Sequence, residues 1–404
     1  MNVIFLGKFF PNNLLLSVLD DSYKKIGFSN HNFEMSIING LCQQPGIELR
    51  CISIPGVFSF PHNNKKLFTR AQEYDYMNTK IYSTGFCNMV GIKEKHATTN
   101  CVKIFNKVLK TLPQGDVHVI INTPDIRLLD VISLIKKSNN RRITQTVIIP
   151  DIPSMVTSMD KQFVLKKIIL NHRDKEAIKR TEESDGIVVL TNEMMDFFKK
   201  PIKHIVMEGI VDVQSMDISN QETNNAKEII LYTGTLRKIF GVMNLISAFK
   251  KIPNKDVELW ICGSGDSKEA IEAAAIADSR IKFFGLVSSK TALEMQHKAT
   301  ILVNPRTSEG EYTKYSFPSK TMEYLLAAKS VVINRLPGIP EEYYNFVYTP
   351  DNESVESFAK CLQYVLNSDR EMRTKRAEAG RQFIVKQKNS KVQIERIIEL
   401  IKTY

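Results

Sequence analysis

The chain has 404 residues, of which 43% are hydrophobic and 25% are charged, and its formal net charge is +11. This length and composition favour two globular domains and exclude a fibrous or wholly disordered protein. No apolar run reaches the roughly 18 residues that span a bilayer. The opening MNVIFLGKFF lacks a small-residue cleavage site and is interpreted as a first strand, not a signal peptide.

Strand and helix patterns alternate through the first half of the chain. Apolar runs predict strands at 2–6, 48–54, 118–122, 144–149 and 186–190. Helical periodicity predicts helices at 32–42, 125–137 and 160–180. Continuous apolar strands that alternate with helices indicate a parallel sheet covered on both faces. Residues 56–96 show the least regular pattern and are expected to form a long loop.

A polar passage over 208–228 separates the two halves and is the best candidate for a linker. The alternation then restarts, with predicted strands at 229–234, 257–265 (running into glycines), 281–285, 300–305 and 330–334. Predicted helices follow at 241–251, 289–298 and in the stretch after Pro318. We therefore expect an α/β protein with two doubly wound domains, and an amphipathic final helix over 388–402 that returns to the first domain.

The six cysteines and seven histidines are scattered, without a CxxC pair or the spacing of a metal site. This favours a reducing compartment and predicts no structural metal. The positive charge leans to the first half, with a net +7 over residues 1–212 and +4 over the remainder. A basic surface suits nucleic acid, anionic lipid or a phosphorylated ligand, although a solvated face is the favoured explanation of the charge alone. No nucleic-acid-binding motif is present.

Three strand ends in the second half carry groups suited to an anion. Gly234 is followed by Arg237 and Lys238, and the turn CGSGD contains Gly263. The third is the helix start with Ser319 and Lys320, where a cation meets the positive end of the helix dipole unless an anion intervenes.

Each of these strand ends alone is a weak signal, because glycine turns are mostly structural and Lys320 with Glu323 can form a surface pair. Ligands bind beyond the carboxyl ends of parallel strands, where the three would converge. The convergence predicts a diphosphate with Glu323 on a ribose. A P-loop and a dinucleotide fingerprint are both absent.

Several motifs resemble glycosyltransferase family 4, the retaining nucleotide-sugar enzymes of GT-B architecture, and especially bacterial members that build extracellular polysaccharides and capsules. The motifs are SDGIVVLTNEMMDFF, VMEGIVD, ILYTGTLRKIFGVMNLISAF, ELWICGSGD, IKFFGLV and NPRTSEGEYTKYSFPSKTMEYLLAAKSVV. The resemblance covers nearly the whole second half and is weaker in the first. It implies two Rossmann-like domains facing a cleft. The acceptor domain would be 1–210, the donor domain 211–385, and the returning helix 386–404.

The resemblance also implies roles for individual residues. Catalytic roles would fall to Asp151, Lys320 and Arg237. Donor binding would involve Gly7, Gly234, Thr235, Lys238, Gly263, Leu286, Val287, Arg306, Ser319 and Glu323. No metal and no cofactor beyond the donor is expected.

The sequence departs from the family pattern at three places. Tyr315 stands where many members carry the first of two glutamates, with Glu309 and Glu311 as nearby loop candidates to replace it. Thr235 and Phe240 stand where members carry an arginine and a lysine. Arg237, Lys238 and Lys320 are expected to supply the displaced positive charge.

The resulting hypothesis is a retaining glycosyltransferase that moves a sugar from a nucleotide diphosphate, by preference UDP, to a hydroxyl of a lipid-linked saccharide in surface polysaccharide synthesis. Such an enzyme would be cytoplasmic, with peripheral contact at the inner face of the plasma membrane. Two alternatives stay open at this point. One is a non-catalytic scaffold of the same fold, suggested by Tyr315. The other is a nucleotide-sugar epimerase or, ranked last, a phosphorylase of the same architecture. The sugar, the acceptor linkage and the oligomeric state have no signal in the sequence.

Overall fold

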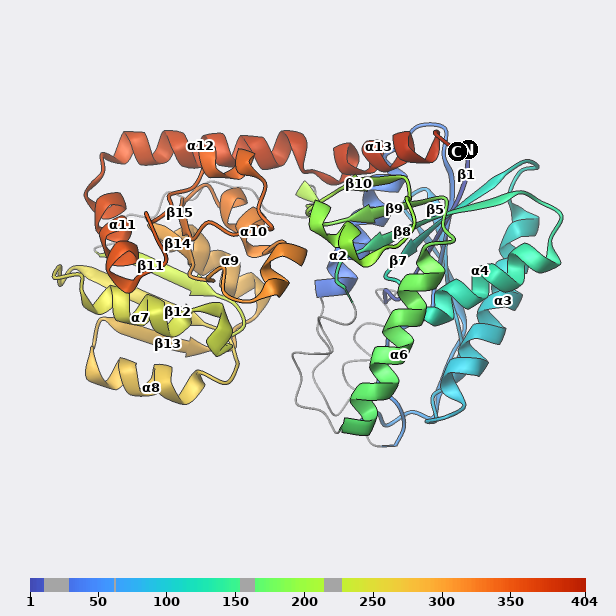
Figure 1. Cartoon of the computed structure of the whole chain (residues 1–404), viewed down its shortest axis with the longest axis horizontal. Helices are drawn as coiled ribbons and strands as arrows, with labels where there is room; N and C mark the ends of the chain where they lie inside the picture. Colours follow the sequence, from blue (N-terminus) through green and yellow to red (C-terminus); the bar gives the residue numbers. More distant parts are fainter. Residues whose placement is uncertain (11–28, 62, 153–163, 214–226) are drawn as a thin grey trace. The chain divides into compact units, whose positions relative to one another are not determined.

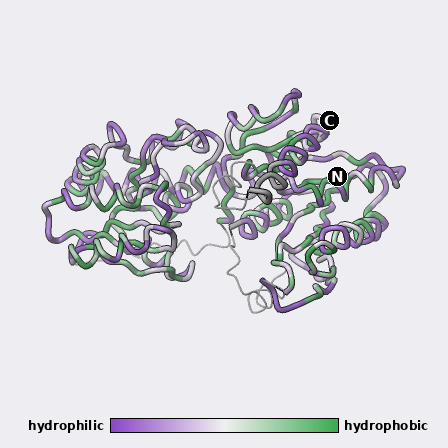
Figure 2. Tube along the Cα trace, turned by 60° about the horizontal axis from the view of Figure 1, so that its bottom comes forward, coloured by the Kyte–Doolittle hydropathy of each residue, from purple (hydrophilic) through white to green (hydrophobic). Residues whose placement is uncertain are grey.

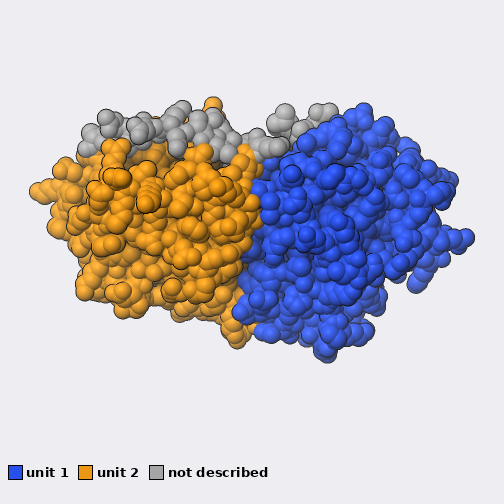
Figure 3. All heavy atoms as spheres, turned by 90° about the horizontal axis from the view of Figure 1, so that it is seen from above, with its two compact units in different colours: residues 1–212, 389–404 blue, residues 213–388 orange. Residues whose placement is uncertain are grey.

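The strands and helices gather into two units (Figure 1), formed by residues 1–212 with 389–404 and by residues 213–388 (Figure 3). The structure is a computed structural model, and it describes residues 1–10, 29–61, 63–152, 164–213 and 227–404. Most of the expected linker lies outside these ranges. Along the trace of each unit, hydrophobic and hydrophilic stretches alternate (Figure 2), and the strands β1 (Asn2–Gly7), β7 (Val117–Asn122) and β14 (Ile301–Asn304) consist of buried residues.

The first unit is built on a sheet that has eight strands among the described residues, in the order β10-β9-β8-β7-β1-β2-β5-β4. Their bounds are β1 Asn2–Gly7, β2 Glu48–Ser53, β4 Gln72–Tyr76, β5 Thr79–Ser83, β7 Val117–Asn122, β8 Ile143–Ile149, β9 Gly186–Val189 and β10 His204–Val206. All neighbours pair in parallel except β4 and β5. Every residue of β1 is buried, so both faces of the sheet centre are covered.

Two groups of helices cover this sheet. Helices α3 (Lys93–Thr111), α4 (Ile126–Ser138) and α6 (Val164–Thr181) pack in sequence against one another. Helix α2 (Ser29–Cys42) packs against α13 (Ser390–Ile401), and both contribute to a core with Val3 and Phe5 of β1. The helix that ends the chain thus completes the core of the first unit. A short 3-10 helix, η1 (Asn192–Phe197), follows β9.

The second unit contains a parallel sheet with the order β13-β12-β11-β14-β15. Its strands are β11 Glu228–Thr233, β12 Val257–Cys262, β13 Ile281–Gly285, β14 Ile301–Asn304 and β15 Ser330–Ile333. Its helices are α7 Val242–Lys250, α8 Lys268–Ala277, α9 Ser289–Lys298, α10 Lys320–Leu326, α11 Val355–Asn367 and α12 Arg370–Gln387. The described part of this unit also contains the 3-10 helices η3 Lys238–Phe240, η4 Glu311–Tyr315 and η5 Glu341–Asn345.

The stretch expected to be a long loop contains more structure than its pattern indicated. Strands β4 and β5 form a hairpin across a two-residue turn at Met77 and Asn78, and Met77 has a positive φ of 49°. A second, small antiparallel pair joins β3 (Phe68–Thr69) to β6 (Phe86–Cys87). Strand β4 lies at the sheet edge, where Tyr74 and Tyr76 pack against the core and the residues between and before them are exposed. Its five residues alternate as a half-buried strand does, but they are too few and too polar to stand out from a loop.

The contact between α2 and α13 depends on the absence of a side chain at Gly40. A Cβ atom there would lie 2.4 Å from the carbonyl oxygen of Ser390 and 2.5 Å from Cγ1 of Ile394. Backbone atoms cannot move aside without separating the two helices. The glycine therefore allows the close approach that seats α13 on the first unit.

We predict that Gly40→Ala destabilises the first unit by about 1–3 kcal/mol, because the overpacking exceeds the roughly 1 kcal/mol that alanine gains in a helix. Thermal unfolding followed by circular dichroism measures the shift. The matched control is Gly56→Ala, where the nearest atoms to an added Cβ lie 3.9 Å away. Equal midpoints for the two variants would contradict the prediction.

Candidate functional site

The carboxyl ends of the second unit's parallel strands bring most of the predicted donor residues to one sheet edge. Gly234 and Thr235 follow β11, Gly263 follows β12, and Leu286 and Val287 follow β13. Arg306 follows β14, and Ser319 and Lys320 lie just before and at the start of α10, ahead of β15. Thr235, Leu286 and Ser319 are exposed. This is the edge at which parallel sheets bind ligands.

The glycines after β11 and β12 hold two loops against each other. Gly263 has a φ of 145°, and a Cβ there would lie 1.8 Å from the carbonyl oxygen of Gly234. The backbone N–H of Gly263 donates to Gly285 (2.7 Å), and that of Leu236 donates to Ser264 (2.9 Å). This close packing accounts for glycine at 263 without a ligand.

The cations after β11 lie on a short 3-10 turn. Arg237 precedes η3 and is half-buried, and Lys238 is its first residue and is exposed. The backbone N–H of Lys238 donates to Oδ1 of Asp266 at 2.8 Å, which ties η3 to the loop after β12. The side chain of Lys238 therefore projects from a fixed backbone position.

Lys320 and Glu323 form a close ion pair at the start of α10. Nζ of Lys320 lies 2.8 Å from both carboxylate oxygens of Glu323. Gln296 of α9 donates through Nε2 to Oε1 of Glu323 at 2.6 Å. Helix α10 begins two residues after Pro318, spans seven residues and has no side-chain cap from Ser319. The cation at this helix start is thus stabilised by a carboxylate within the chain.

A buried network holds the Glu323 carboxylate in place. Gln296 is fully buried and also approaches Oγ1 of Thr233 at 3.3 Å. The hydroxyl of Tyr324, fully buried, receives the N–H of Thr233 at 3.0 Å and donates to the Thr233 carbonyl at 3.1 Å. Burial raises the pKa of Tyr324, so the hydroxyl stays neutral. The last residue of β11 therefore fixes both α9 and α10.

The side chain of Arg306 contacts three neighbouring segments of the second unit. The side chain is 8% exposed, and its guanidinium lies over the rings of Tyr312 (4.6 Å) and Phe240 (5.6 Å). Nη2 donates to Oγ of Ser316 at 2.7 Å. Its partners come from η3, η4 and the turn before α10, so Arg306 connects these three segments.

The position of the missing family glutamate lies at the end of η4. Tyr315 is half-buried, with Nζ of Lys314 5.8 Å from its ring centre. Of the two loop candidates, Glu311 is exposed and pairs with Lys314 at 3.7 Å. Glu309 is also exposed. These positions show no placed carboxylate comparable to that of Glu323.

In the first unit, a buried carboxyl group lies beside the predicted Gly7. Glu34 of α2 is fully buried and accepts from the backbone N–H of Lys8 (3.0 and 3.1 Å) and from Nδ2 of Asn122 (2.7 Å). A Cβ on Gly7 would lie 2.7 Å from Oε1 of Glu34. Burial raises the pKa of Glu34 to about 7, although its hydrogen bonds oppose the shift.

Three cations surround this carboxyl edge of the first sheet. Lys8 and Arg127 both pair with Asp125, the latter at 2.7 Å. Burial alone would raise the pKa of Asp125, but the charge of Lys8 and the hydrogen bonds of Arg127 hold it well below its usual range. Burial and the nearby charge of Arg127 lower the pKa of Lys93 to about 8. We call Lys8, Lys93 and Arg127, with Asp125, the basic cluster.

Asp151 lies two residues after β8 and is exposed. In the sheet order, β8 is separated from β1 by β7, so Asp151 and Gly7 follow strands two places apart. The end of the motif IIPDIPSM falls at residues 153–155, outside the described ranges.

Several residues that surround the predicted site residues could not be recognised from the sequence. Those in the second unit are Thr233, Gln296 and Tyr324, and those in the first are Lys8, Glu34, Lys93, Asn122, Asp125 and Arg127. One signal was available for Glu34: with Ile37, Ile38 and Leu41 it occupies positions i, i+3, i+4 and i+7, so a charged residue stands on the apolar face.

The described residues show neither a metal site nor a membrane-spanning helix. They contain no group of three or more His, Cys, Asp or Glu side chains placed to hold a metal ion. No helix in the same ranges has the length and hydropathy needed to cross a membrane.

The family comparison bears on the second unit. Residues 227–368 match the family model described as glycosyl transferases group 1. The match supports a glycosyltransferase. It includes the sheet edge with Lys320, Glu323 and Gln296 described above. No curated protein matches the chain in a sequence search.

Solved structures resemble the whole chain. Sucrose-phosphate synthase from Thermosynechococcus elongatus has a TM-score of 0.63 at 12% identity, with all of both chains covered. A structure described as trehalose-6-phosphate from E. coli bound with UDP-2-fluoro glucose has 0.65 at 10% identity, with 99% of each chain covered. A lipopolysaccharide outer core galactosyltransferase has 0.58 at 13% identity, covering 100% of this chain and 99% of the other.

The chain has the GT-B fold. Identities this low establish the fold alone, so the GT-B likeness assigns no substrate.

We predict that the buried Glu34 makes stability fall with rising pH. Its pKa is raised from 4.5 to about 7 on folding, so the folded state binds more protons between these values. The stabilisation is present below about pH 4.5 and is lost as pH rises to about 7. Relative to Glu34→Gln, the wild type should lose about 2–3 kcal/mol of unfolding free energy between pH 5 and 8.

Thermal unfolding of both proteins at a series of pH values measures this difference, and any constant cost of the substitution cancels. Glu269→Gln, at an exposed position on α8, serves as the control and should run parallel to the wild type. If Glu34→Gln also runs parallel to the wild type, the carboxyl group is ionised at both ends of the range and the prediction is wrong.

Proposed function

We propose that the protein is a retaining glycosyltransferase that moves a sugar from a UDP-linked donor to a hydroxyl group of a lipid-linked saccharide, in the synthesis of a surface polysaccharide. The observation that carries this proposal is the carboxylate of Glu323, held by Lys320 and Gln296 at the carboxyl edge of a parallel sheet. That carboxylate lies inside the segment that matches glycosyl transferases group 1.

The second unit would hold the donor. Glu323 is 28% exposed in its side chain, and its anchored carboxylate can accept hydrogen bonds from a ribose diol. Lys320 has three ammonium protons and directs two toward Glu323, so one is available to a diphosphate oxygen without breaking the pair. Arg237 and Lys238 would add positive charge from the neighbouring loop.

The reaction breaks the bond between the anomeric carbon and the phosphate oxygen of the donor. A bond from the acceptor oxygen forms on the same face of the sugar, and the acceptor proton passes to the departing phosphate oxygen. Negative charge grows on the diphosphate during this step. Fixed cations such as Lys320 and Arg237 stabilise that charge most effectively when they are already in place.

The first unit would hold the acceptor, with Asp151 near the reacting sugar and the loop at Gly7 near the donor phosphate. The basic cluster at the same sheet edge suits an acceptor that carries phosphate groups. Two neighbours support the choice of donor and acceptor. One is described as bound with UDP-2-fluoro glucose, and another as a galactosyltransferase of the lipopolysaccharide outer core.

The alternative of a non-catalytic scaffold rests on Tyr315, which occupies the position of a family glutamate. A scaffold would bind the nucleotide without turnover. Incubation of the purified chain with UDP-sugars, followed by analysis for transfer or donor hydrolysis, separates the two functions. The same product analysis detects an epimerised sugar nucleotide.

We predict that the wild type binds UDP, in preference to GDP, in a calorimetric titration. The Lys320→Ala substitution should weaken the affinity for this nucleotide about 10- to 150-fold. This corresponds to the roughly 1.5–3 kcal/mol of a charge-assisted contact. Lys320→Arg should retain most of the affinity, because the charge remains. Glu323→Gln should also weaken binding, since the ribose acceptor and the partner of Lys320 are both altered.

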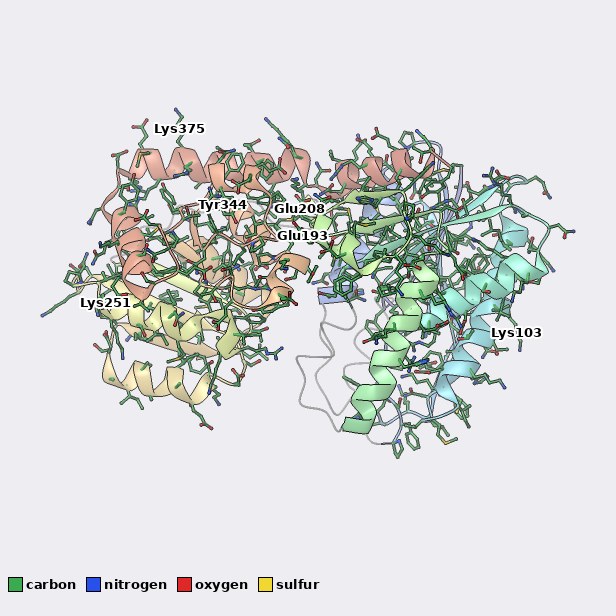
Figure 4. All side chains as sticks on the ribbon, in the orientation of Figure 1. Lys103, Glu193, Glu208, Lys251, Tyr344 and Lys375 are labelled. Atoms are coloured by element: carbon green, nitrogen blue, oxygen red, sulfur yellow. The ribbon has the colours of Figure 1, made fainter. Side chains whose placement is uncertain are left out.

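The control is Lys375→Ala. This side chain projects from α12 into solvent (Figure 4) and should have no effect on the affinity. Absence of binding to either nucleotide, or equal affinities for Lys320→Ala and Lys375→Ala, would refute the donor site proposed at the start of α10.

A further inference from the structure

Four large apolar side chains are exposed together on the first unit. Phe68 is 60% exposed, Met89 39%, Val90 63% and Ile92 46%. They belong to two segments, the described residues 57–61 with 63–70 and residues 86–92, which we call the tip. Three of the four lie within four consecutive residues, so they cannot all turn inward by a local change of rotamer. Exposed apolar groups clustered in this way mark an interaction surface.

The tip is a built structure whose two segments are joined at Asn88. Its backbone N–H donates to the carbonyl of Leu67 (2.6 Å), and its carbonyl receives the N–H of Phe60 (3.0 Å). Its side chain, 1% exposed, donates to the carbonyls of Phe58 (2.7 Å) and Lys66 (3.3 Å). Pairing of Phe68 with Cys87 adds a second connection. The exposed side chains therefore stand on a fixed backbone.

Positive charges outnumber negative ones around the tip. Lys65, Lys66, Arg70 and Lys95 are all exposed. Residues 57–70 contain no acidic residue. In the continuation of the second segment, Glu94 is ion-paired with Arg173 of α6 at 3.0 Å. The apolar tip is thus bordered by net positive charge.

The chain's topology places the tip at the carboxyl edge of the first sheet. Its first segment follows β2 and its second follows β5, and both strands run parallel to β1. Nζ of Lys93, directly after Ile92, donates to the carbonyl of Val57. Lys93 is also a member of the basic cluster. The tip and the candidate acceptor residues therefore share one edge.

We propose that the tip is a membrane anchor, in which Phe68, Met89, Val90 and Ile92 enter the interface of a bilayer while the surrounding lysines meet anionic lipid headgroups. Apolar insertion and electrostatic attraction reinforce each other in such interfacial binding. A protein partner with a negatively charged surface is disfavoured, because protein interfaces are depleted in lysine whereas anionic leaflets attract it. The anchor would bring the basic cluster to the phosphates of a lipid-linked acceptor.

The link to the acceptor rests on the proposed function, but the membrane contact does not. Vesicle binding is therefore measured with the full chain in the absence of donor, by co-sedimentation at low salt. The vesicles contain phosphatidylcholine alone or mixed with phosphatidylglycerol. The wild type should bind the mixed vesicles, and binding should decrease as salt is added.

Val90→Asp/Ile92→Asp should weaken partition into the mixed vesicles about tenfold or more, because two charges would have to enter the interface. The matched control is Ile276→Asp on α8, at a side chain that is 87% exposed in the second unit, and it should bind as the wild type does. Lys65→Glu/Lys66→Glu should weaken binding to the mixed vesicles. Lys103→Glu, on the same unit but further along α3 (Figure 4), should weaken it less.

Failure of the wild type to bind the mixed vesicles, or equal losses for Ile276→Asp and the tip variant, would overturn the proposal. So would a dimer in size-exclusion chromatography that the tip variant abolishes, because the surface would then bind a second copy. UDP titration on the same samples keeps the two proposals apart. Vesicle binding without nucleotide binding rejects the donor site alone, and the reverse result rejects the anchor alone.

Discussion

Parallel strand pairing is the constraint on which both units depend. It sends every strand of the second sheet, and all but β4 of the first, in one direction, so the loops that follow the strands collect at a single edge of each sheet. The connecting helices must then cover both faces, which explains the fully buried β1 and the paired layers of helices. This arrangement brings together residues that are distant in the sequence: the backbone nitrogen of Thr233 lies 3.0 Å from the hydroxyl oxygen of Tyr324.

The same constraint explains why much of the fold could be predicted from the sequence. Buried parallel strands appear as continuous apolar runs, and nearly all of these runs coincide with strands of the structure to within a residue or two. The hairpin of β4 and β5 could not be predicted in this way. Its outer strand is short and polar, and its turn uses Met77 in a conformation that a residue pattern rarely indicates.

The candidate site was less accessible from the sequence than the fold. Glycines and cations after strands could be recognised, because their spacing along the chain is local. The partner of Lys320 could be guessed from the i, i+3 spacing, but Gln296 lies on another helix and reaches Glu323 only through the tertiary fold. Glu34 was not recognised because its neighbours on the same face of α2 are apolar, and their periodicity predicts only that this face packs in the core.

The position of α13 has a consequence for the order in which the protein forms during synthesis. The first unit needs residues 389–404, whose Ile394, Ile397 and Ile401 belong to its core, whereas the second unit is continuous from 213 to 388. A ribosome therefore releases the second unit complete while α2 still lacks its partner. The face of α2 that packs on α13 therefore stays uncovered until the whole second unit has been synthesised, which lengthens the time during which the first unit exposes hydrophobic surface.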